Sequence, residues 1–500
     1  MKKLLFTLNL ISLIAILSLS AQNRPYGMGL IIDDEAYSQV PHLPQYAGKK
    51  YNKVPLKISL KEYCPTPGNQ GLNGSCSAWA AGYGGLTILR AVQDNLQGQE
   101  QITKVASSVF FLFNQIKISE DCEEGARLSD AMQVLNEQGD CLAKNFDVAA
   151  DCSMMPGPNQ LQEASQYKIK DYAAIFHHDA DAATKIQKTK RALASKTPVV
   201  MGMLVTESFW GIEPGQKQWQ PTAEDNIVGG HAMVVVGYDE VRKSFEVMNS
   251  WGPDWANKGF VWIKYQDFAK YCKYGFQMVL DENTAIEKED IAVKDVTNEK
   301  ITLSGAFAFR YPTGYEEDEN GNEVIAFEDA AVSFNETNLI YETIRKDWAV
   351  GDVFQLLAKK IPVGENIYIF SLSPANKVQL HWPLNEGVDA LNKVPLADFV
   401  PSKDAEIIVP GENEALQLAE LGTDHLVILY SNNKIANITT RINFLTTLNG
   451  SIQERLQQTF GDVLLPPQHI KYELDRMEFN SNATEKDGFV VPIILAVTAQ

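Results

Sequence analysis

The sequence predicts an α+β protein in which a helical lobe precedes an antiparallel β lobe, followed by a mostly-β, sandwich-like C-terminal domain. Apolar residues at helical spacing dominate residues 61–165, and this pattern predicts the helical lobe. β-branched and aromatic runs, separated by Gly and Asn-Lys turns, dominate from residue 197 onward. The chain has 500 residues, whereas a single core rarely exceeds roughly 250 to 300. We therefore expect several domains.

The first 21 residues have the layout of a secretory signal peptide. Two lysines precede an apolar run, and small residues end it at Ser20 and Ala21. A retained membrane anchor is the alternative, but polar Asn9 and Ser12 shorten the apolar run. The later stretch FVVPIILAV is too short to span a bilayer and contains a proline. We therefore expect an exported bacterial protein, periplasmic or extracellular.

Residues 22–60 are rich in Pro, Tyr and Lys without periodicity, and we interpret them as an extended N-terminal arm. Helices are expected next, because apolar residues recur at helical spacing and the last of the three segments has a glycine, Gly139, at the expected stop. The segments are AWAAGYGGLTILRAVQD (78–94), SVFFLFNQIK (108–117) and ARLSDAMQVLNEQGD (126–140).

Strands follow and complete a domain that we place at residues 61–285. The expected strands are TPVVMGMLV (197–205), HAMVVVGYDE (231–240), SFEVMNS (244–250), GFVWIKY (259–265) and FQMVLD (276–281). Residues 286–300 are charged, lack aromatic side chains and are interpreted as a linker.

Residues 301–500 contain several short strand-like runs separated by turn signals, which favours a β-sandwich. One helix, GSIQERLQQTFGD, interrupts the runs. The stretches VGENIYIFSLSPANKVQLHWPLN and LAELGTDHLVILYSN resemble β-rich modules of unknown function in bacterial secreted peptidases. Trp382 and Tyr430 offer a binding face as one interpretation, but we favour core packing. A binding or docking role is the default for such a domain, and its ligand is not indicated.

Charge and cysteine usage exclude several functions. The net charge of −19 argues against nucleic acid and against anionic membrane surfaces as partners. The six cysteines have no CxxC spacing, and no HExxH motif occurs, so no metal and no cofactor is implied. Cys122, Cys141 and Cys152 lie close together in the chain and predict one local disulfide, with the pairing left open.

The stretch GNQGLNGSCSAWAAGYGG (68–85) places a lone cysteine, Cys76, at the start of a helix. A thiol at a helix N-terminus ionises more readily, because the helix dipole stabilises the thiolate. The small residues after Cys76 allow the helix to pack tightly between other elements, and Gly74 leaves backbone space beside the sulfur. Taken alone, such a cysteine is more often a small buried hydrophobe.

Two further segments favour a chemical role for Cys76. GGHAMVVVGYDE places His231 at the start of a strand, and NSWGPDWANKGFVWI places Asn249 at the end of another. Two antiparallel strands would bring these ends together, so that the asparagine accepts from one imidazole nitrogen and the other faces the thiol. Trp251 is placed to shield that hydrogen bond. Each residue alone is more often structural.

The three segments NQGLNGSCSAW, GGHAMVVVGYD and NSWGPDWANKGFVWI together resemble the papain-like cysteine peptidases. They follow the family order, 155 and then 18 residues apart at Cys76, His231 and Asn249. The resemblance covers residues 61–282 and implies that Cys76 is the nucleophile, His231 the general base and acid, and Asn249 the residue that orients the imidazole. It implies that Gln70 and the N–H of Cys76 stabilise the oxyanion. Losing one such donor costs roughly 10²–10³-fold in rate.

The sequence also departs from the family pattern. Asn73 stands where the family has a disulfide cysteine, and Ser77 stands where it has tryptophan. About 40 residues separate the signal peptide from the catalytic domain, too few for a helical inhibitory propeptide. Either the enzyme is made in an active form or the arm covers the cleft, and we favour the arm as a partial cover.

The resemblance also indicates residues that bind substrate. It implies that Gly125 and Gly230 pair with the substrate backbone, and that Met203 and Trp251 line the cleft. Apolar or small residues around the second substrate side chain favour a hydrophobic preference, with unselective cleavage as the alternative.

These patterns predict a secreted endopeptidase that acts on peptide or protein substrates. Two alternatives use the same residues differently. An exopeptidase or acyl transferase would use the same triad, whereas a catalytically silent papain-shaped binding protein would have no need for all four of Gln70, Cys76, His231 and Asn249. Labelling by an epoxysuccinyl inhibitor distinguishes an active site from a silent one.

Overall fold

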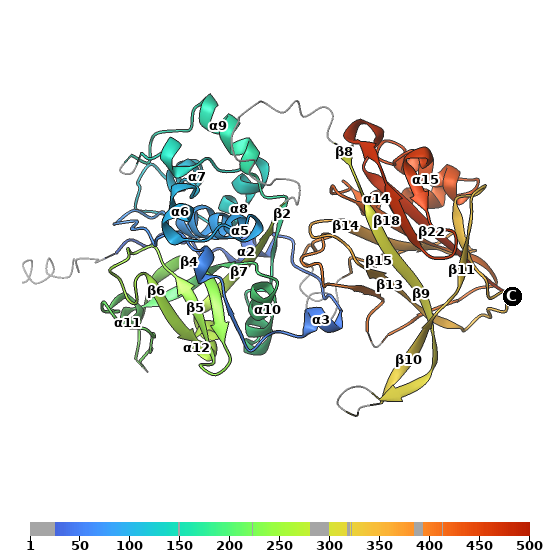
Figure 1. Cartoon of the computed structure of the whole chain (residues 1–500), viewed down its shortest axis with the longest axis horizontal. Coiled ribbons are helices and arrows are strands. Elements are labelled where there is room, and N and C mark those ends of the chain that lie inside the picture. Colours follow the sequence, from blue (N-terminus) through green and yellow to red (C-terminus); the bar gives the residue numbers. More distant parts are fainter. Residues whose placement is uncertain are drawn as a thin grey trace, which may run out of the picture.

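The computed structural model describes residues 26–148, 151–222, 224–280, 300–317, 321, 323–384, 394–412 and 414–500. The expected signal peptide and nearly all of the expected linker lie outside these residues. Two bodies stand side by side, one formed by residues up to 280 and the other by residues from 300 onward (Figure 1). Among the described residues, no helix combines the length and the apolar character needed to cross a membrane.

The three helices expected in the first body are confirmed. The first is continuous from Cys76 but widens to π-helical geometry in its middle, so that it comprises α4 (Cys76–Ala78), the π-helix η2 (Trp79–Leu86) and α5 (Thr87–Gln93). The other helices of this lobe are α6 (Gln99–Lys104), α7 (Val109–Ile116), α8 (Leu128–Glu137) and α9 (Pro158–Ala164). Ser108 caps α7 by accepting a hydrogen bond from the N–H of Phe111.

The small residues of η2 let the helix lie directly on the sheet, as expected. A Cβ atom added at Gly84 would lie 2.6 Å from Val234 Cγ2, and one at Gly85 would lie 2.6 Å from Val200 Cγ2. A larger side chain at either position would push the helix away from β3 and β4, which carry these valines.

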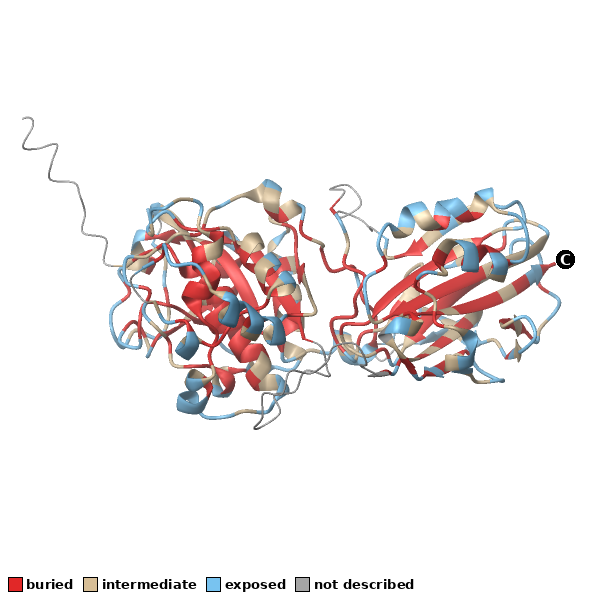
Figure 2. Cartoon of the chain, turned by 90° about the horizontal axis from the view of Figure 1, so that it is seen from above, coloured by how far each residue is buried: buried red, intermediate tan, exposed pale blue. Residues whose placement is uncertain are grey.

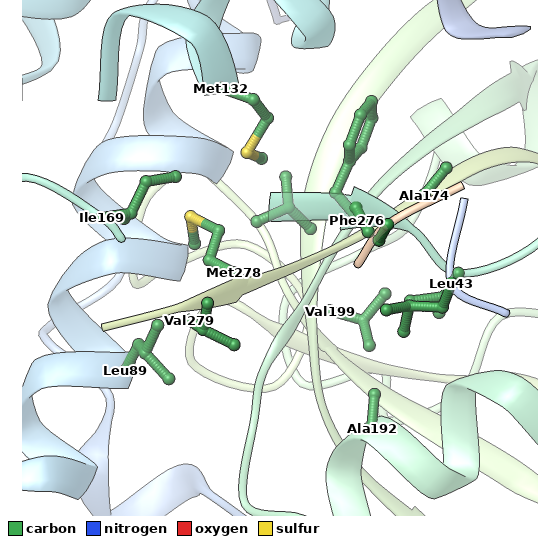
Figure 3. Close-up of a cluster of buried hydrophobic side chains, with 14 of the residues drawn as sticks. Leu43, Leu89, Met132, Ile169, Ala174, Ala192, Val199, Phe276, Met278 and Val279 are labelled. Atoms are coloured by element: carbon green, nitrogen blue, oxygen red, sulfur yellow. The ribbon is translucent and has the colours of Figure 1, made fainter. Parts of the chain in front are cut away.

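The β lobe is an antiparallel sheet with the strand order β2-β7-β3-β4-β5-β6, and β1 pairs with β4. The predicted strands are confirmed, and α10 and α12, which were not predicted, pack against the sheet. The elements are β1 (Lys57–Ser59), β2 (Asp171–Ala174), α10 (Ala182–Ala194), β3 (Val199–Thr206), α11 (Glu207–Trp210), β4 (Ile227–Asp239), β5 (Ser244–Met248), β6 (Phe260–Lys264), α12 (Tyr265–Tyr271) and β7 (Cys272–Val279). Figure 3 shows the core where these helices and strands meet.

The second body contains two stacked sheets. One has the order β16-β13-β9-β20-β19, with β10 beside β9 and β17 beside β13, and the other has the order β11-β12-β22-β18-β14-β15. The strands are β8 (Lys300–Ile301), β9 (Ser304–Glu317), β10 (Glu323–Asp329), β11 (Val332–Asn335), β12 (Ile340–Thr343), β13 (Val353–Lys359), β14 (Asn366–Leu372), β15 (Val378–Trp382), β16 (Ile407–Val409), β17 (Leu416–Gln417), β18 (Gly422–Ser431), β19 (Ile470–Tyr472), β20 (Glu478–Ser481), β21 (Ala483–Thr484) and β22 (Val490–Ala499).

Aromatic side chains join the two sheets of the second body. The ring of Tyr430 lies 6.5 Å from that of Phe307 and 5.1 Å from that of Phe479. Trp382 and Tyr430 are both buried, so the core interpretation of these residues is confirmed. The far face of the second sheet is covered by α14 (Ile438–Phe444) and the predicted α15 (Ile452–Phe460), and Figure 2 shows buried strands inside the second body.

The N-terminal arm is partly helical rather than wholly extended. It contains the short helices α2 (Asp34–Ser38) and α3 (Lys49–Asn52) and ends in β1. The side chain of Asp33 caps α2 by accepting a hydrogen bond from Ala36 N–H at 2.9 Å. Asp33 is of a residue type that commonly caps helices, but α2 is too short to show helical periodicity in the sequence.

One disulfide joins Cys122 and Cys152, which confirms the expected local bridge. Cys64, Cys76, Cys141 and Cys272 are free and buried.

Replacing Tyr430 with alanine should destabilise the second body selectively. The substitution empties a buried site between the sheets, and such changes cost about 3–5 kcal/mol. Differential scanning calorimetry should show the unfolding of the second body at a lower temperature. Tyr315→Ala is the matched control, because Tyr315 is 73% exposed. Equal shifts in the two variants would contradict this account of the core.

Candidate active site

Cys76 lies at the start of the central helix, between the two lobes of the first body. α4 packs against β4, and the backbone N–H of Ala232 donates toward the Cys76 sulfur. Ala232 directly follows His231 in the strand. The fold therefore brings the predicted nucleophile next to the predicted histidine, although 155 residues separate them in the chain.

His231 and Asn249 form the hydrogen bond expected between two neighbouring strand ends. His231 Nε2 lies 2.7 Å from Asn249 Oδ1, which also accepts the N–H of Ser250 at 2.8 Å. Because two donors point at this oxygen, the amide orientation is fixed and Nε2 carries the proton. The ring of Trp251 stacks on the imidazole with centroids 4.6 Å apart. The structure thus brings these residues together and covers their hydrogen bond.

Gln70 is held in place by the residue after Asn249. Its Oε1 accepts from Ser250 Oγ at 2.6 Å, and its backbone N–H donates to the Ser250 carbonyl at 2.9 Å. Its Nε2 donates to the carbonyls of Asn73, at 2.7 Å, and Met28, at 3.4 Å. The sequence analysis did not identify Ser250, although its position beside Asn249 in the motif NSW was a signal.

Cys76 and His231 are both electrically neutral in this state. Burial raises the pKa of the Cys76 thiol to about 12 and lowers the pKa of the His231 imidazole to about 4. Within the described part of the chain, His231 Nδ1 has no hydrogen-bond partner, so no bond joins it to the sulfur. The helix N-terminus alone therefore does not ionise this thiol, because the loss of solvent outweighs the helix dipole.

Residues 26–32 of the arm, which we call the plug, lie in the cleft beside these residues and pair with both of its walls. Gly27 N–H donates to the Gly71 carbonyl at 2.7 Å, and the Gly27 carbonyl accepts from Trp251 Nε1 at 2.9 Å. The ring of Tyr26 also stacks on the indole of Trp251, with ring centroids 4.8 Å apart. The plug therefore contacts the tryptophan that shields the His231–Asn249 pair.

The plug backbone pairs with both walls of the cleft. Ala126 N–H donates to the Gly29 carbonyl at 2.9 Å, and Ile31 N–H donates to the Ala126 carbonyl at 3.1 Å. On the other wall, Leu30 N–H donates to the Gly230 carbonyl at 3.3 Å. Gly230 thus presents its carbonyl to a chain in the cleft, whereas on the helical wall Ala126, rather than Gly125, makes the hydrogen bonds.

The side chain of Leu30 is buried against the β lobe. A Cβ atom added at Gly202 would lie 2.7 Å from Leu30 Cδ2, and Tyr274 and Leu128 are the next nearest side chains at that position. Gly202 pairs with Ala232 across the sheet, and Met203 pairs with His231. Because neighbouring strand residues point to opposite faces, the plug touches Gly202 and not the predicted Met203.

Two glycines allow the plug to lie this deep. Gly29 has φ +137°, and an added Cβ would lie 2.2 Å from the Gly74 carbonyl oxygen. An added Cβ at Gly27 would lie 2.6 Å from the Asn73 carbonyl oxygen. Both contacts are with backbone atoms, which cannot rotate out of the way as a side chain would.

Ser77 contacts the helical wall of the cleft. Its Oγ donates to the Ala126 carbonyl at 3.0 Å, so the helix that carries Cys76 is tied to the residue that pairs with the plug. A hydroxyl here also lowers the thiol pKa, although less than burial raises it.

One cluster of residues that are able to ligate metal lies elsewhere in the first body. Ligand atoms of His177, His178 and Asp179 lie within 4.8 Å of one another. The group contains none of the predicted site residues.

A buried cysteine at a helix start, beside a histidine held by an asparagine, defines a site of the cysteine-protease type. Residues 62–280 match the family model described as papain family cysteine protease. An uncharacterized peptidase C1-like protein of Acanthamoeba polyphaga mimivirus is 30% identical over 223 residues, covering 43% of this chain and 66% of that protein. The chain thus spans just under two thirds of this relative.

Solved structures of similar proteins include xylellain, a cysteine protease from Xylella fastidiosa. It is 24% identical, with a TM-score of 0.44, and the match covers 53% of this chain and all of that one. The bromelain protease of Ananas comosus, in complex with the E64 inhibitor, is 17% identical with a TM-score of 0.36, covering 46% of this chain and all of that one.

Alkylation of Cys76 should report its raised pKa. Because only the thiolate reacts and burial raises the thiol pKa to about 12, iodoacetamide should modify Cys76 slowly at pH 8 while the N-terminal segment covers the cleft, and faster once limited proteolysis has removed that segment. Peptide mapping by mass spectrometry separates Cys76 from Cys272, whose pKa is also raised to about 12 by burial. Equal rates for Cys76 with and without the N-terminal segment would contradict the prediction.

Proposed function

We propose that this chain is an exported cysteine endopeptidase that is synthesised in a latent form. The observation that carries the proposal is the hydrogen bond between His231 Nε2 and Asn249 Oδ1, which leaves Nδ1 free on the Cys76 side under the cover of Trp251. This arrangement supports proton exchange between imidazole and thiol once the cleft is open. Export is supported by the signal-peptide pattern of residues 1–21.

In the proposed reaction, Cys76 first transfers its proton to His231 and attacks a peptide carbonyl carbon as thiolate. Gln70 Nε2 and the N–H of Cys76 donate to the oxygen that becomes negative. The C–N bond then breaks, and the imidazolium gives its proton to the departing amine. Water, deprotonated by the same imidazole, hydrolyses the acyl-enzyme and restores the free thiol.

Latency follows from the plug. The groups that would bind a substrate are engaged by this segment: Gln70 by the Met28 carbonyl, Ala126 by Gly29 and Ile31, and Gly230 by Leu30. The plug also removes solvent from the sulfur, and this raises the thiol pKa. A substrate must therefore displace the plug or arrive after its removal.

The plug also supports a preference for an apolar substrate side chain. Leu30 lies over Gly202, and the next nearest side chains at that position are those of Tyr274 and Leu128. We propose that an aliphatic substrate side chain occupies the same space after the plug leaves.

The proposed function is tested by labelling and hydrolysis under reducing conditions. The chain, freed of the plug by limited proteolysis, should react with an epoxysuccinyl inhibitor at Cys76 and should cleave members of a peptide library. Cys76→Ala should abolish both activities. Gln70→Ala should remain labelled but lose roughly 10²–10³-fold in kcat, because one oxyanion donor is removed.

Cys141→Ala is the matched control, because Cys141 is another free, buried cysteine. Activity that survives in Cys76→Ala, or an unlabelled wild-type chain with an opened cleft, would contradict the peptidase proposal. The second outcome would favour the silent binding protein.

A side chain at residue 29 should displace the plug without any cleavage. Gly29→Val forces a clash with the Gly74 carbonyl and places a β-branched residue at φ +137°. Strain of this kind costs about 1–3 kcal/mol before the clash is added, so epoxysuccinyl labelling of Cys76 should accelerate at least roughly tenfold. Labelling at pH 7, followed by intact-mass measurement, gives the rate.

Gly314→Val is the control, since Gly314 also has a positive φ, at +150°, but an added Cβ meets nothing within 4 Å. It should label at the wild-type rate. Unchanged labelling of Gly29→Val in a folded chain would show that the plug does not limit access to the sulfur.

A further inference from the structure

Three of the seven histidines of the chain lie together where the N-terminal arm meets the first body. His177 and His178 directly precede Asp179 in the turn between β2 and α10, and the two imidazole rings lie 4.1 Å apart. His42 belongs to the arm, and its ring lies 5.9 Å from that of His177. The fold thus adds an imidazole from the arm to two from the body.

Backbone hydrogen bonds fix the arm at this place. Leu43 N–H donates to the Ala174 carbonyl at 2.9 Å, and both side chains lie in the core shown in Figure 3. On the other side, His42 N–H donates to the Pro395 carbonyl of the second body at 2.8 Å. His42 is therefore held between the two bodies, next to the pair of histidines.

The group has the spacing that a metal ion requires. One ligand atom from each of His177, His178 and Asp179 lies within 4.8 Å of the other two, and no other set of three has this property in the part of the chain that the structure describes. His178 Nε2 and Asp179 Oδ2 are 3.2 Å apart. Ligands that each bind zinc at about 2.0–2.2 Å in a tetrahedron stand roughly 3.4 Å from one another, so this pair already has a suitable separation.

The arm brings a second carboxylate to the same nitrogen. Asp34 of α2 places its Oδ2 3.7 Å from His178 Nε2. Its orientation is fixed, because Oδ1 accepts from the Tyr274 hydroxyl at 2.8 Å and Oδ2 lies 3.1 Å from Lys273 Nζ. Carboxylates that are held by hydrogen bonds in this way are typical of metal sites. Two carboxylates, one from the body and one from the arm, therefore approach one imidazole.

The protonation of His42 provides an independent observation. This residue is 2% exposed, and its Nδ1 donates to the Val40 carbonyl at 2.8 Å. Because a carbonyl only accepts, neutral His42 carries its proton on Nδ1 and a lone pair on Nε2. Nε2 is buried and has no hydrogen-bond partner among the described residues. Histidines that bind metal usually donate the other N–H to a carbonyl or carboxylate, as His42 does.

His177 also presents a lone pair. Its Nδ1 accepts the N–H of Asp179 at 3.3 Å, which is a long hydrogen bond. A cation at this nitrogen would replace that weak contact with a stronger one. The cost of displacing the existing partner is therefore small.

The ligand types indicate the class of cation. Imidazole nitrogen together with carboxylate oxygen suits zinc and the neighbouring transition metals, whereas magnesium and calcium prefer oxygen ligands throughout. Asp34 and Asp179 would together balance the charge of a divalent ion. A protonated His178 is the competing explanation for the two carboxylates, but it does not account for the buried lone pair of His42.

We propose that His177, His178 and Asp179 bind a divalent transition-metal ion of the zinc class, and that Asp34 and His42 close the site from the arm. Neither arm residue belongs to the set of three mutually close ligand atoms, so both move toward the ion when it binds. The ion would fasten the arm to the first body. None of these residues is part of the candidate active site, so the proposal does not depend on the peptidase function.

Metal binding is tested on the full chain without a histidine tag, carrying Cys76→Ala so that the thiol of the candidate active site cannot bind zinc. Equilibrium dialysis against ZnCl2, followed by metal analysis, should give one tightly bound zinc ion per chain. MgCl2 in excess should not displace it. A chain that retains no zinc, or that loses it to magnesium, would overturn the proposal.

Two variants in the body locate the ion. Asp179→Asn should weaken zinc binding at least roughly tenfold, because residues that merely support a metal ligand already contribute roughly 10–100-fold in affinity. The side chain of Asp179 is 73% exposed, so the fold should not depend on it. His178→Lys keeps a positive charge beside the two carboxylates but removes the ligand, and it should lose zinc to a similar extent.

His469→Ala is the matched control, because His469 lies in the second body, where its Nδ1 contacts the Asn482 carbonyl at 3.2 Å. This variant should bind zinc as the parent chain does. Wild-type affinity in both Asp179→Asn and His178→Lys would place the ion elsewhere and overturn the proposal.

The contribution of the arm is tested by Asp34→Asn and His42→Phe. The first keeps an acceptor for the Tyr274 hydroxyl, and the second keeps a ring of similar size. Each should weaken zinc binding roughly tenfold. Zinc should also raise the unfolding temperature of the first body in the parent chain, because a ligand that binds only the folded state stabilises it. This increase should be absent in His178→Lys. Unchanged affinity in both arm variants would overturn the role of the arm.

Discussion

The close contact between the central helix and the sheet is the constraint on which the site depends. Gly84 and Gly85 let η2 pack directly against Val234 on β4 and Val200 on β3. Because β4 also carries His231, this contact sets the position of Cys76 relative to the imidazole. A helix kept a few ångströms further away by larger side chains would leave the same residues in the same order with no common site. The run of small residues after Cys76 is therefore as important as the cysteine itself.

Burial has opposite consequences for the fold and for the chemistry. The plug completes the cleft with backbone hydrogen bonds and the apolar Leu30, which stabilises the covered state. Burial in the covered state raises the pKa of Cys76 and lowers that of His231, so both groups are neutral where the proposed reaction requires an ion pair. The proposed latency thus has two components, a steric one at Gln70 and Ala126 and an electrostatic one at the sulfur. Removing the plug relieves both at once.

Much of this arrangement was predictable from the sequence, and the remainder has physical reasons. The strands and the first helices were predicted because each segment is long enough to show its periodicity. The contact between His231 and Asn249 was predicted because the two strand ends are neighbours in an antiparallel pair. α2 and α3 were missed because helices of a few residues show no period. Gly202 was missed because it lies one residue from the predicted Met203, and alternation along β3 decides which of the two faces the cleft. Ala126 was missed because it binds through its backbone, which leaves no signal in the residue type.

Trp251 contacts both the predicted catalytic residue His231 and the plug. One surface of its indole stacks on His231, Tyr26 stacks on the ring as well, and its Nε1 donates to the Gly27 carbonyl. The interactions that keep the plug in place therefore do not include the hydrogen bond between His231 and Asn249. Neither does the bond between Gln70 and Ser250 involve the plug. Ser250 and the strands hold Gln70, His231 and Asn249 without help from the plug. We therefore expect these residues to keep their arrangement when the plug leaves.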